Sequence, residues 1–160
     1  YARLGEGDRA LDCMEILARS STGPNLFTYH NDWRGMGLSM GGWSAQPPFQ
    51  IDANFGITAA VLEMLVFSKP GLVKLLPALP AKWRKGKVSG IRCRGGITVD
   101  IEWDTDSHIM RAALTSSTDQ KVSLRLPKWA KERDKGDGCR EIVLKKGMPV
   151  TIVTDAKRDK

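Results

Sequence analysis

The chain has 160 residues, of which 41% are hydrophobic and 27% charged, and its formal net charge is +7 at pH 7. This composition is typical of one compact globular domain or two small packed units. The longest apolar stretch, around residues 57–67, is interrupted by Thr58 and Glu63 and is too short and too polar to span a bilayer, so we expect no membrane partner.

The basic residues do not form a nucleic-acid-binding signature. They gather at residues 82–87, 128–135 and 157–160, where Gly, Asp or Glu interrupts them, as in solvated loops. No aromatic-plus-basic sheet pattern or basic recognition helix accompanies them, so we expect no nucleic-acid partner.

The cysteines and histidines do not have the spacing of a metal site. The chain has three cysteines, Cys13, Cys93 and Cys139, and two histidines, and no two of the cysteines are close in sequence. A structural zinc site usually needs four ligands with close pairs, so we expect no metal and no cofactor. Cys13 lies on an apolar helical face and is expected in the core. The sequence leaves open whether Cys93 and Cys139 form a disulfide.

The first half of the chain has helical periodicity. Asp8 is a candidate capping residue, and apolar residues then recur at spacings of three and four, which predicts a helix ending near Ser20. A Gly-rich loop over residues 25–48 follows, and loops of this length are often functional. A second helix, expected from about Asn54 to Phe67, is apolar over most of its girth. Two helices alone cannot cover such a surface, which favours a larger helical assembly.

The second half, after Pro70, has the periodicity of strands. Residues 72–80 look like an apolar connector broken by prolines. Alternation between turn signals predicts strands at residues 88–94, 97–103, 108–115, 121–126, 140–144 and 149–154. Their even spacing indicates an antiparallel β-sandwich-like module. The expected fold class is therefore α+β, with a boundary between residues 1–68 and 69–160.

Several ordered runs carry a resemblance to a known family. The run from Pro47 to Gly56, PPFQIDANFG, resembles the sugar-cleaving motif of glycoside hydrolase family 95, the inverting 1,2-α-L-fucosidases and their relatives. Further similar runs, which together cover about residues 1–104, are Arg3–Ala10, Pro24–Phe27, Glu63–Leu65, Leu75–Pro80, Gly90–Gly96 and Val99–Trp103.

The resemblance implies an architecture and an activity. Residues 1–68 would be the last helices of an (α/α)6 catalytic barrel, and residues 69–160 the C-terminal β module. The chain starts at Tyr1 inside a helical pattern, so we expect it to be a piece of a longer protein. The upstream part of the same polypeptide would supply a catalytic glutamate and two asparagines, and this fragment alone would be inactive. The implied substrate is a fucosylated oligosaccharide or glycan, and the parent protein would be secreted or periplasmic.

Asp52 is the expected catalytic residue. In the family the aspartate of this motif is the general base, and an inverting hydrolase needs such a base to activate water opposite an acid. An aspartate at the start of a helix meets the positive end of the helix dipole. The simpler interpretation of Asp52 is a helix cap, and Asn54 is either the cap itself or a residue that orients Asp52. Phe49 and Phe55 are expected in the core rather than against a sugar.

Other candidate substrate contacts come from the loop. Many relatives have a histidine directly before the two prolines, where this chain has Gln46, and His30 lies further upstream. His30 or Trp33 is a candidate for the missing sugar contact, and Trp33 and Trp43 are candidate stacking platforms. Gln46 and Asn54 are the further candidate substrate contacts. This departure leaves open an α-L-galactosidase of the same family. A non-catalytic carbohydrate-binding or structural fragment is the remaining alternative.

Overall fold

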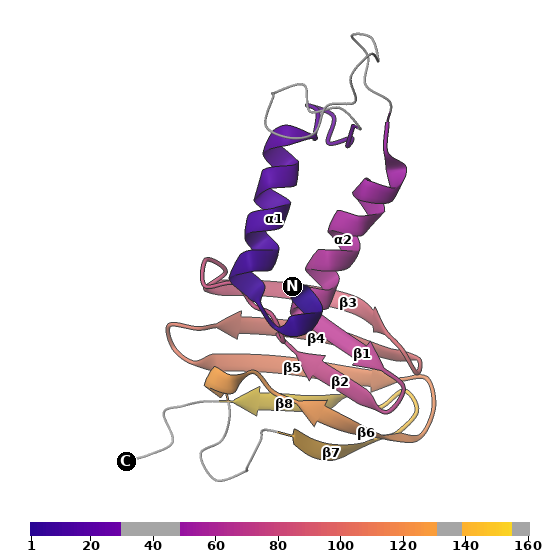
Figure 1. Ribbon diagram of the computed structural model, residues 1–160. Coiled ribbons are helices and arrows are strands. Elements are labelled where there is room, and N and C mark those ends of the chain that lie inside the picture. Colours follow the sequence, from indigo (N-terminus) through magenta and orange to yellow (C-terminus); the bar gives the residue numbers. More distant parts are fainter. Residues whose placement is uncertain (30–48, 131–138, 155–160) are drawn as a thin grey trace.

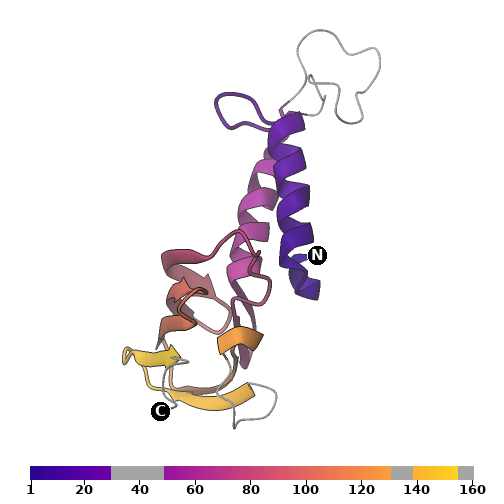
Figure 2. The same cartoon turned by 90° about the vertical axis from the view of Figure 1, so that its left-hand side faces the viewer.

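The computed structural model describes residues 1–29, 49–130 and 139–154, and every structural statement below concerns these residues. Two helices lie side by side and rise from one end of a module of strands (Figures 1 and 2). The elements are η1 (Ala2–Leu4), α1 (Gly7–Ser20), α2 (Ile51–Leu65), β1 (Val66–Lys69), β2 (Leu72–Leu75), β3 (Lys85–Cys93), β4 (Ile97–Asp104), β5 (Ile109–Ser116), β6 (Gln120–Arg125), η2 (Lys128–Ala130), β7 (Cys139–Leu144) and β8 (Val150–Thr154). This order of helices before strands fits the predicted α+β class.

The strands form two four-stranded sheets, in the orders β1-β2-β6-β7 and β3-β4-β5-β8. Most neighbours are antiparallel, as predicted, but β2 and β6 are parallel, with Val73 opposite Leu124. The expectation of a wholly antiparallel module is therefore wrong at this pair. The reason is topological: β3, β4 and β5 belong to the other sheet, so the chain returns to the first sheet at β6 in the direction of β2.

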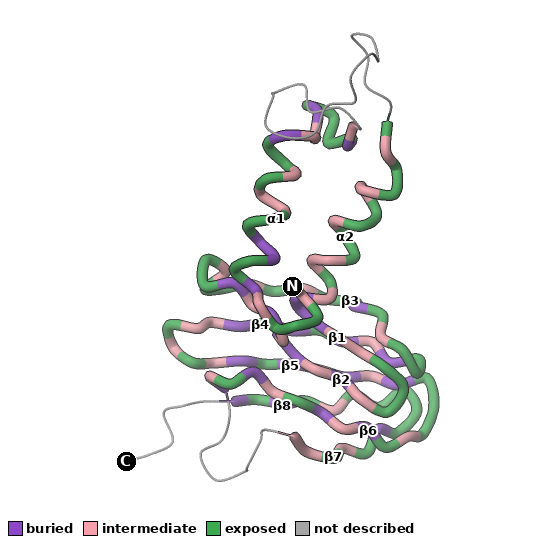
Figure 3. Tube along the Cα trace, in the orientation of Figure 1, coloured by how far each residue is buried: buried purple, intermediate pink, exposed green. Residues whose placement is uncertain are grey.

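A hydrophobic core lies between the two sheets. In β4 the residues Ile97, Val99, Ile101 and Trp103 are buried, whereas Asp100 between them is exposed. Buried residues of both sheets form one cluster, which includes Val73, Val122, Leu124 and Leu144 from the first sheet and Met110, Leu114 and Ile152 from the second. Figure 3 shows buried positions concentrated in the strands, while the helices are largely exposed or half-buried. The alternation that predicted the strands is thus the alternation between core and solvent.

The segment expected to be a connector, residues 72–80, begins with β2, the second strand of a hairpin. β1 follows α2 directly, and Pro70 and Gly71 separate it from β2, with Gly71 at φ 75°. The second helix was expected to end near Phe67, and this is wrong. The helix ends at Leu65, because Val66 is extended and pairs with Leu75. These strands have only four residues each, so they offer too little alternation to distinguish them from a helix end and a loop.

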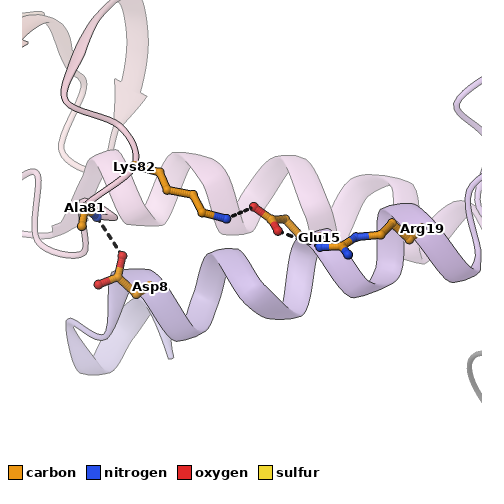
Figure 4. A network of polar contacts seen from close by, with 5 residues as sticks. All are labelled: Asp8, Glu15, Arg19, Ala81 and Lys82. Atoms are coloured by element: carbon orange, nitrogen blue, oxygen red, sulfur yellow. Dashed lines mark hydrogen bonds and ion pairs between the residues drawn. The ribbon is translucent and has the colours of Figure 1, made fainter.

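The base of α1 is fastened to the segment after β2. Asp8 does not cap the helix, since the N-cap residue is Glu6 and no side-chain cap bond is present there. The Asp8 carboxylate instead accepts a 2.7 Å hydrogen bond from the backbone N–H of Ala81 (Figure 4). Glu15, further along the helix, binds Lys82 at 2.7 Å and Arg19 at 2.9 Å. The bond from Lys82 is the main reason that the pKa of Glu15 lies below its usual value.

The structure bears on the expected place of Cys13 and on the open question of a disulfide between Cys93 and Cys139. Cys13 is exposed on α1, so its expected place in the core is wrong for this chain. Only one side of α1 packs on the rest of the described structure, at Ala10, Leu11 and Met14. Cys93 and Cys139 lie on strands of different sheets, and no disulfide joins them.

Candidate active site

Asp52 lies in the first turn of α2 and is exposed. The helix begins at Ile51 rather than near Asn54, and Gln50 is the N-cap residue without a side-chain cap bond. The simple interpretation of Asp52 as a cap is therefore wrong, and so is the interpretation of Asn54 as the cap. Asp52 occupies the second helical position, where free backbone N–H groups and the helix dipole produce a positive potential.

The surroundings of Asp52 are open and partly apolar. Ile51 is 54% exposed and Phe55 is 67% exposed, so the expectation that Phe55 is a core residue is wrong for this chain. Phe49 is 44% exposed, and its ring lies 4.7 Å from the ring of Phe27, centroid to centroid. An ionisable group beside exposed aromatic surface at a helix N-terminus is suited to a polar ligand with an apolar face.

The residues around Thr28 hold the start of α2. The backbone N–H of Thr28 donates to Asn54 Oδ1 at 2.9 Å, and Asn54 Nδ2 donates to the carbonyl oxygen of Leu26 at 2.9 Å. The hydroxyl of Thr28 donates to the carbonyl oxygen of Gln50 at 2.5 Å, and the N–H of Gln50 donates back to the carbonyl of Thr28 at 2.9 Å. We call Leu26, Thr28, Gln50 and Asn54 the clamp. Asn54 was a predicted site residue. Leu26 and Thr28 were not, although Leu26 lies in the run Pro24–Phe27 that resembles the family.

Four predicted substrate contacts cannot be placed. His30, Trp33, Trp43 and Gln46 lie outside the described residues. The structure does bring together the two residues that flank residues 30–48, since Tyr29 and Phe49 form an antiparallel β-bridge. The clamp and this bridge thus join the chain on both sides of that segment to the first turn that carries Asp52.

Asp52 has no second carboxylate close to it on its own helix. The other acidic residue of α2, Glu63, lies eleven residues further on, about 16 Å along the axis. It is also engaged, because both of its oxygens accept from Arg3, at 2.6 and 2.7 Å. An inverting pair has a separation of roughly 6.5–9.5 Å, so Glu63 does not fit the role of the acid.

Other features of the described residues do not add a site near Asp52. A cleft of about 350 Å³ lies at the opposite end of α2, lined in part by Arg3, Lys74, Arg125, Lys128 and Trp129. Among residues 1–29, 49–130 and 139–154, no group of three or more His, Cys, Asp or Glu could hold a metal ion. No helix in these ranges is long and apolar enough to cross a membrane.

Comparison with protein families assigns both halves of the chain. Residues 1–65 match the glycosyl hydrolase family 95 catalytic domain, and residues 67–158 match the glycoside hydrolase family 95 C-terminal domain. These matches meet where α2 passes into β1, and Asp52 and the clamp fall within the first. The class is thus that of the glycoside hydrolases. The chain belongs to glycoside hydrolase family 95, which confirms the resemblance found in the sequence.

Curated relatives agree with this assignment. The chain is 52% identical over 91 residues to Alpha-L-fucosidase 2 of Arabidopsis thaliana, covering 56% of this chain and 10% of the relative. It is 43% identical over 91 residues to Probable alpha-fucosidase A of Aspergillus oryzae, covering 51% and 13%. It is 42% identical over 73 residues to Probable alpha-fucosidase A of Aspergillus niger, covering 39% and 9%. The chain therefore spans about a tenth of the length of these relatives.

Proposed function

We propose that the chain is the C-terminal part of an inverting exo-glycosidase that hydrolyses α-L-fucosidic linkages of glycans, with Asp52 as the general base. The observation that carries the proposal is the place of Asp52: it is exposed on the first turn of α2, within the residues that match the family's catalytic domain. The relatives named as fucosidases support the choice of sugar.

The proposed mechanism needs one water molecule and two carboxyl groups. Asp52 removes a proton from the water, whose oxygen attacks the anomeric carbon of the fucosyl residue. The bond from that carbon to the glycosidic oxygen breaks, and an acid on the opposite side protonates the leaving oxygen. The product sugar has the inverted anomeric configuration. Because Glu63 is too far away and bound to Arg3, we assign the acid to the upstream part of the same polypeptide.

The exposed apolar faces of the two helices support this larger assembly. Ile16 on α1 and Ile51, Phe55 and Leu62 on α2 are exposed large hydrophobic side chains. Helices of soluble proteins normally cover such residues by packing. We therefore propose that α1 and α2 are the last helices of an (α/α)6 barrel and that the boundary to the β module lies near Ser68. On this proposal the 160-residue chain alone releases no fucose.

The test is the substitution Asp52→Asn in the full-length parent protein. Removal of a general base lowers turnover by roughly 10²–10⁴-fold, so we expect a fall of that size in kcat on a fucosylated oligosaccharide. Asp12→Asn is the matched control, since Asp12 is an exposed carboxylate on the neighbouring helix α1, and it should leave kcat unchanged. Near-normal turnover by the Asp52→Asn protein would refute the proposal.

A second candidate activity follows from Gln46, which stands where many relatives have a histidine before the two prolines. A changed contact at this place would alter the recognition of the sugar, which favours α-L-galactosides as the alternative substrate. Parallel assays with α-L-fucoside and α-L-galactoside, which share the ring configuration, decide between the two through kcat/KM. A non-catalytic carbohydrate-binding role predicts binding of both sugars with hydrolysis of neither.

A further inference from the structure

The first turn of α2 depends on a hydrogen bond from outside the helix. The carbonyl oxygen of Gln50 should accept the first helical bond, but the N–H of Asn54 lies 3.5 Å away, at the limit of a hydrogen bond. The Thr28 hydroxyl is much closer to the same oxygen, at 2.5 Å. The Thr28 hydroxyl also lies 2.9 Å from Asn54 Oδ1. A hydroxyl has one proton, and the nearer acceptor, the Gln50 carbonyl oxygen, takes it. The turn that carries Asp52 is therefore held by Thr28 more tightly than by its own helical bond.

Thr28 is built into the structure as a fixed point. Its side chain is 0% exposed, although its neighbour Phe27 is 48% exposed. Leu26, which accepts from the Asn54 amide, has φ 64°, a left-handed conformation that is unfavourable for a branched side chain. Such residues persist only where surrounding interactions hold them, and they gather at functional sites.

The clamp and the carboxylate lie on different sides of the helix. Successive residues of an α-helix are rotated by about 100°, so Asp52 and Asn54 are separated by roughly 200° around the axis. Asn54 points to Leu26 and Thr28, to which it is bonded. Asp52 therefore points away from the clamp, and the clamp can act on it only through the backbone of the first turn.

We propose that Thr28 and Asn54 are positioning residues that fix the rotation of the first turn of α2 and thereby the direction of the Asp52 carboxylate. This inference rests on the proposed role of Asp52 as the general base. A base must lie within hydrogen-bond reach of the water that it activates. A displacement of about 1 Å at a reacting group can cost on the order of 10²-fold in rate. Loss of the clamp should therefore lower kcat more than it raises KM.

The experiment compares Thr28→Val in two backgrounds of the full-length parent protein, wild type and Asp52→Asn. Val keeps the shape of Thr but cannot donate to Gln50. In the wild type we expect kcat to fall about 10- to 100-fold, with KM changed less than about threefold. In the Asp52→Asn background the same substitution should change the residual kcat by less than about twofold, because residues that act through one group are not additive.

Three further variants separate positioning from general stability. Thr28→Ser retains the hydroxyl and should restore most of the activity. Thr58→Val is the matched control: it removes a hydroxyl one turn further along α2, where Thr58 Oγ1 donates to the Asn54 carbonyl at 3.3 Å, and should leave kcat unchanged. Asn54→Ala removes the side-chain bonds to Thr28 and Leu26 at a helical position that favours alanine. Asn54→Ala should lower kcat as Thr28→Val does, and it provides the test if the Thr28→Val protein does not fold.

The outcomes distinguish the inference from the proposed function. The inference is overturned if the folded Thr28→Val and Asn54→Ala proteins retain wild-type kcat. It is also overturned if each loses the same factor in both backgrounds, because that indicates a general structural role. If instead Asp52→Asn alone leaves turnover intact, the proposed function fails.

Discussion

Gly7 marks a close approach between α1 and the segment after β2, and a single added methyl group should disrupt this contact. A Cβ atom at Gly7 would lie 2.8 Å from the carbonyl carbons of Ala78 and Leu79, and nearer still to the carbonyl oxygen of Ala78. Ordinary contact begins at 3.4 Å, so backbone must move apart by at least ~0.6 Å. The start of α1 and residues 78–81 are held in place, because Ala78 is buried beside Met64 and the Ala81 N–H donates to the Asp8 carboxylate.

The expected size of the effect follows from two opposing contributions. Overpacking of a rigid site costs about 1–3 kcal/mol, whereas alanine in place of glycine at a helical position gains at most about 1 kcal/mol. Because backbone blocks the site and no flexible side chain can turn aside, the cost lies in the upper part of that range, about 2–3 kcal/mol. Less the gain of about 1 kcal/mol, Gly7→Ala should lower the free energy of unfolding of the 160-residue chain by about 1–2 kcal/mol.

Gly56→Ala is the matched control. Gly56 lies inside α2, and a methyl group added there would meet nothing within 4 Å, so only the gain in helix propensity remains. We expect stabilisation by about 0.5–1 kcal/mol. Urea unfolding followed by far-UV circular dichroism measures both variants. A Gly7→Ala chain as stable as the wild type would refute the steric reasoning, and destabilisation by Gly56→Ala would refute the assignment of that site as open.

The β module offers two further tests. Leu144 is 0% exposed, whereas its neighbour Val143 is 53% exposed. Leu144→Ala should therefore lower the free energy of unfolding by about 2–5 kcal/mol, and Val143→Ala by about 0.5 kcal/mol or less. Equal effects of the two substitutions in urea unfolding would contradict the assigned sandwich core. Lys85, together with backbone N–H groups of Ser107 and Asp106, lowers the pKa of Asp104 to about 2 from 3.8. The folded state thus favours the charged form, so this stabilisation is present above about pH 4 and is lost as the pH falls toward 2. The stability difference between wild type and Asp104→Asn should vanish over that range, and an NMR titration midpoint of Asp104 near 4 would contradict the lowered pKa.

Features that depend on neighbouring residues in the chain were predicted well. Strands 97–103 and 121–126 were predicted within one residue at each end, because alternation between core and solvent is written along a single strand. The end of α1 at Ser20 was also predicted correctly. Asp52 was singled out by the run of residues around it.

Features that depend on distant residues were not predicted. β1 and β2 are too short to show a period, and their pairing with each other and with β6 defines them as strands. The start of α2 was misplaced by three residues, because Gln50 is held by Thr28, 22 residues earlier. Cys13 and Phe55 were assigned to a core since their neighbours are apolar, yet the described structure leaves both exposed.

The amino-acid order alone determined the class of fold, the family and the one carboxylate to which the proposed chemistry is assigned. The class of fold is encoded in side chains that alternate or recur within a few residues. The family and the carboxylate are encoded in short runs of particular residues that resemble the family's motifs. The tertiary structure decided which way the strands run, where the second helix starts and what holds its first turn. Those properties arise from hydrogen bonds and packing between segments that are far apart along the chain, where no local pattern records them.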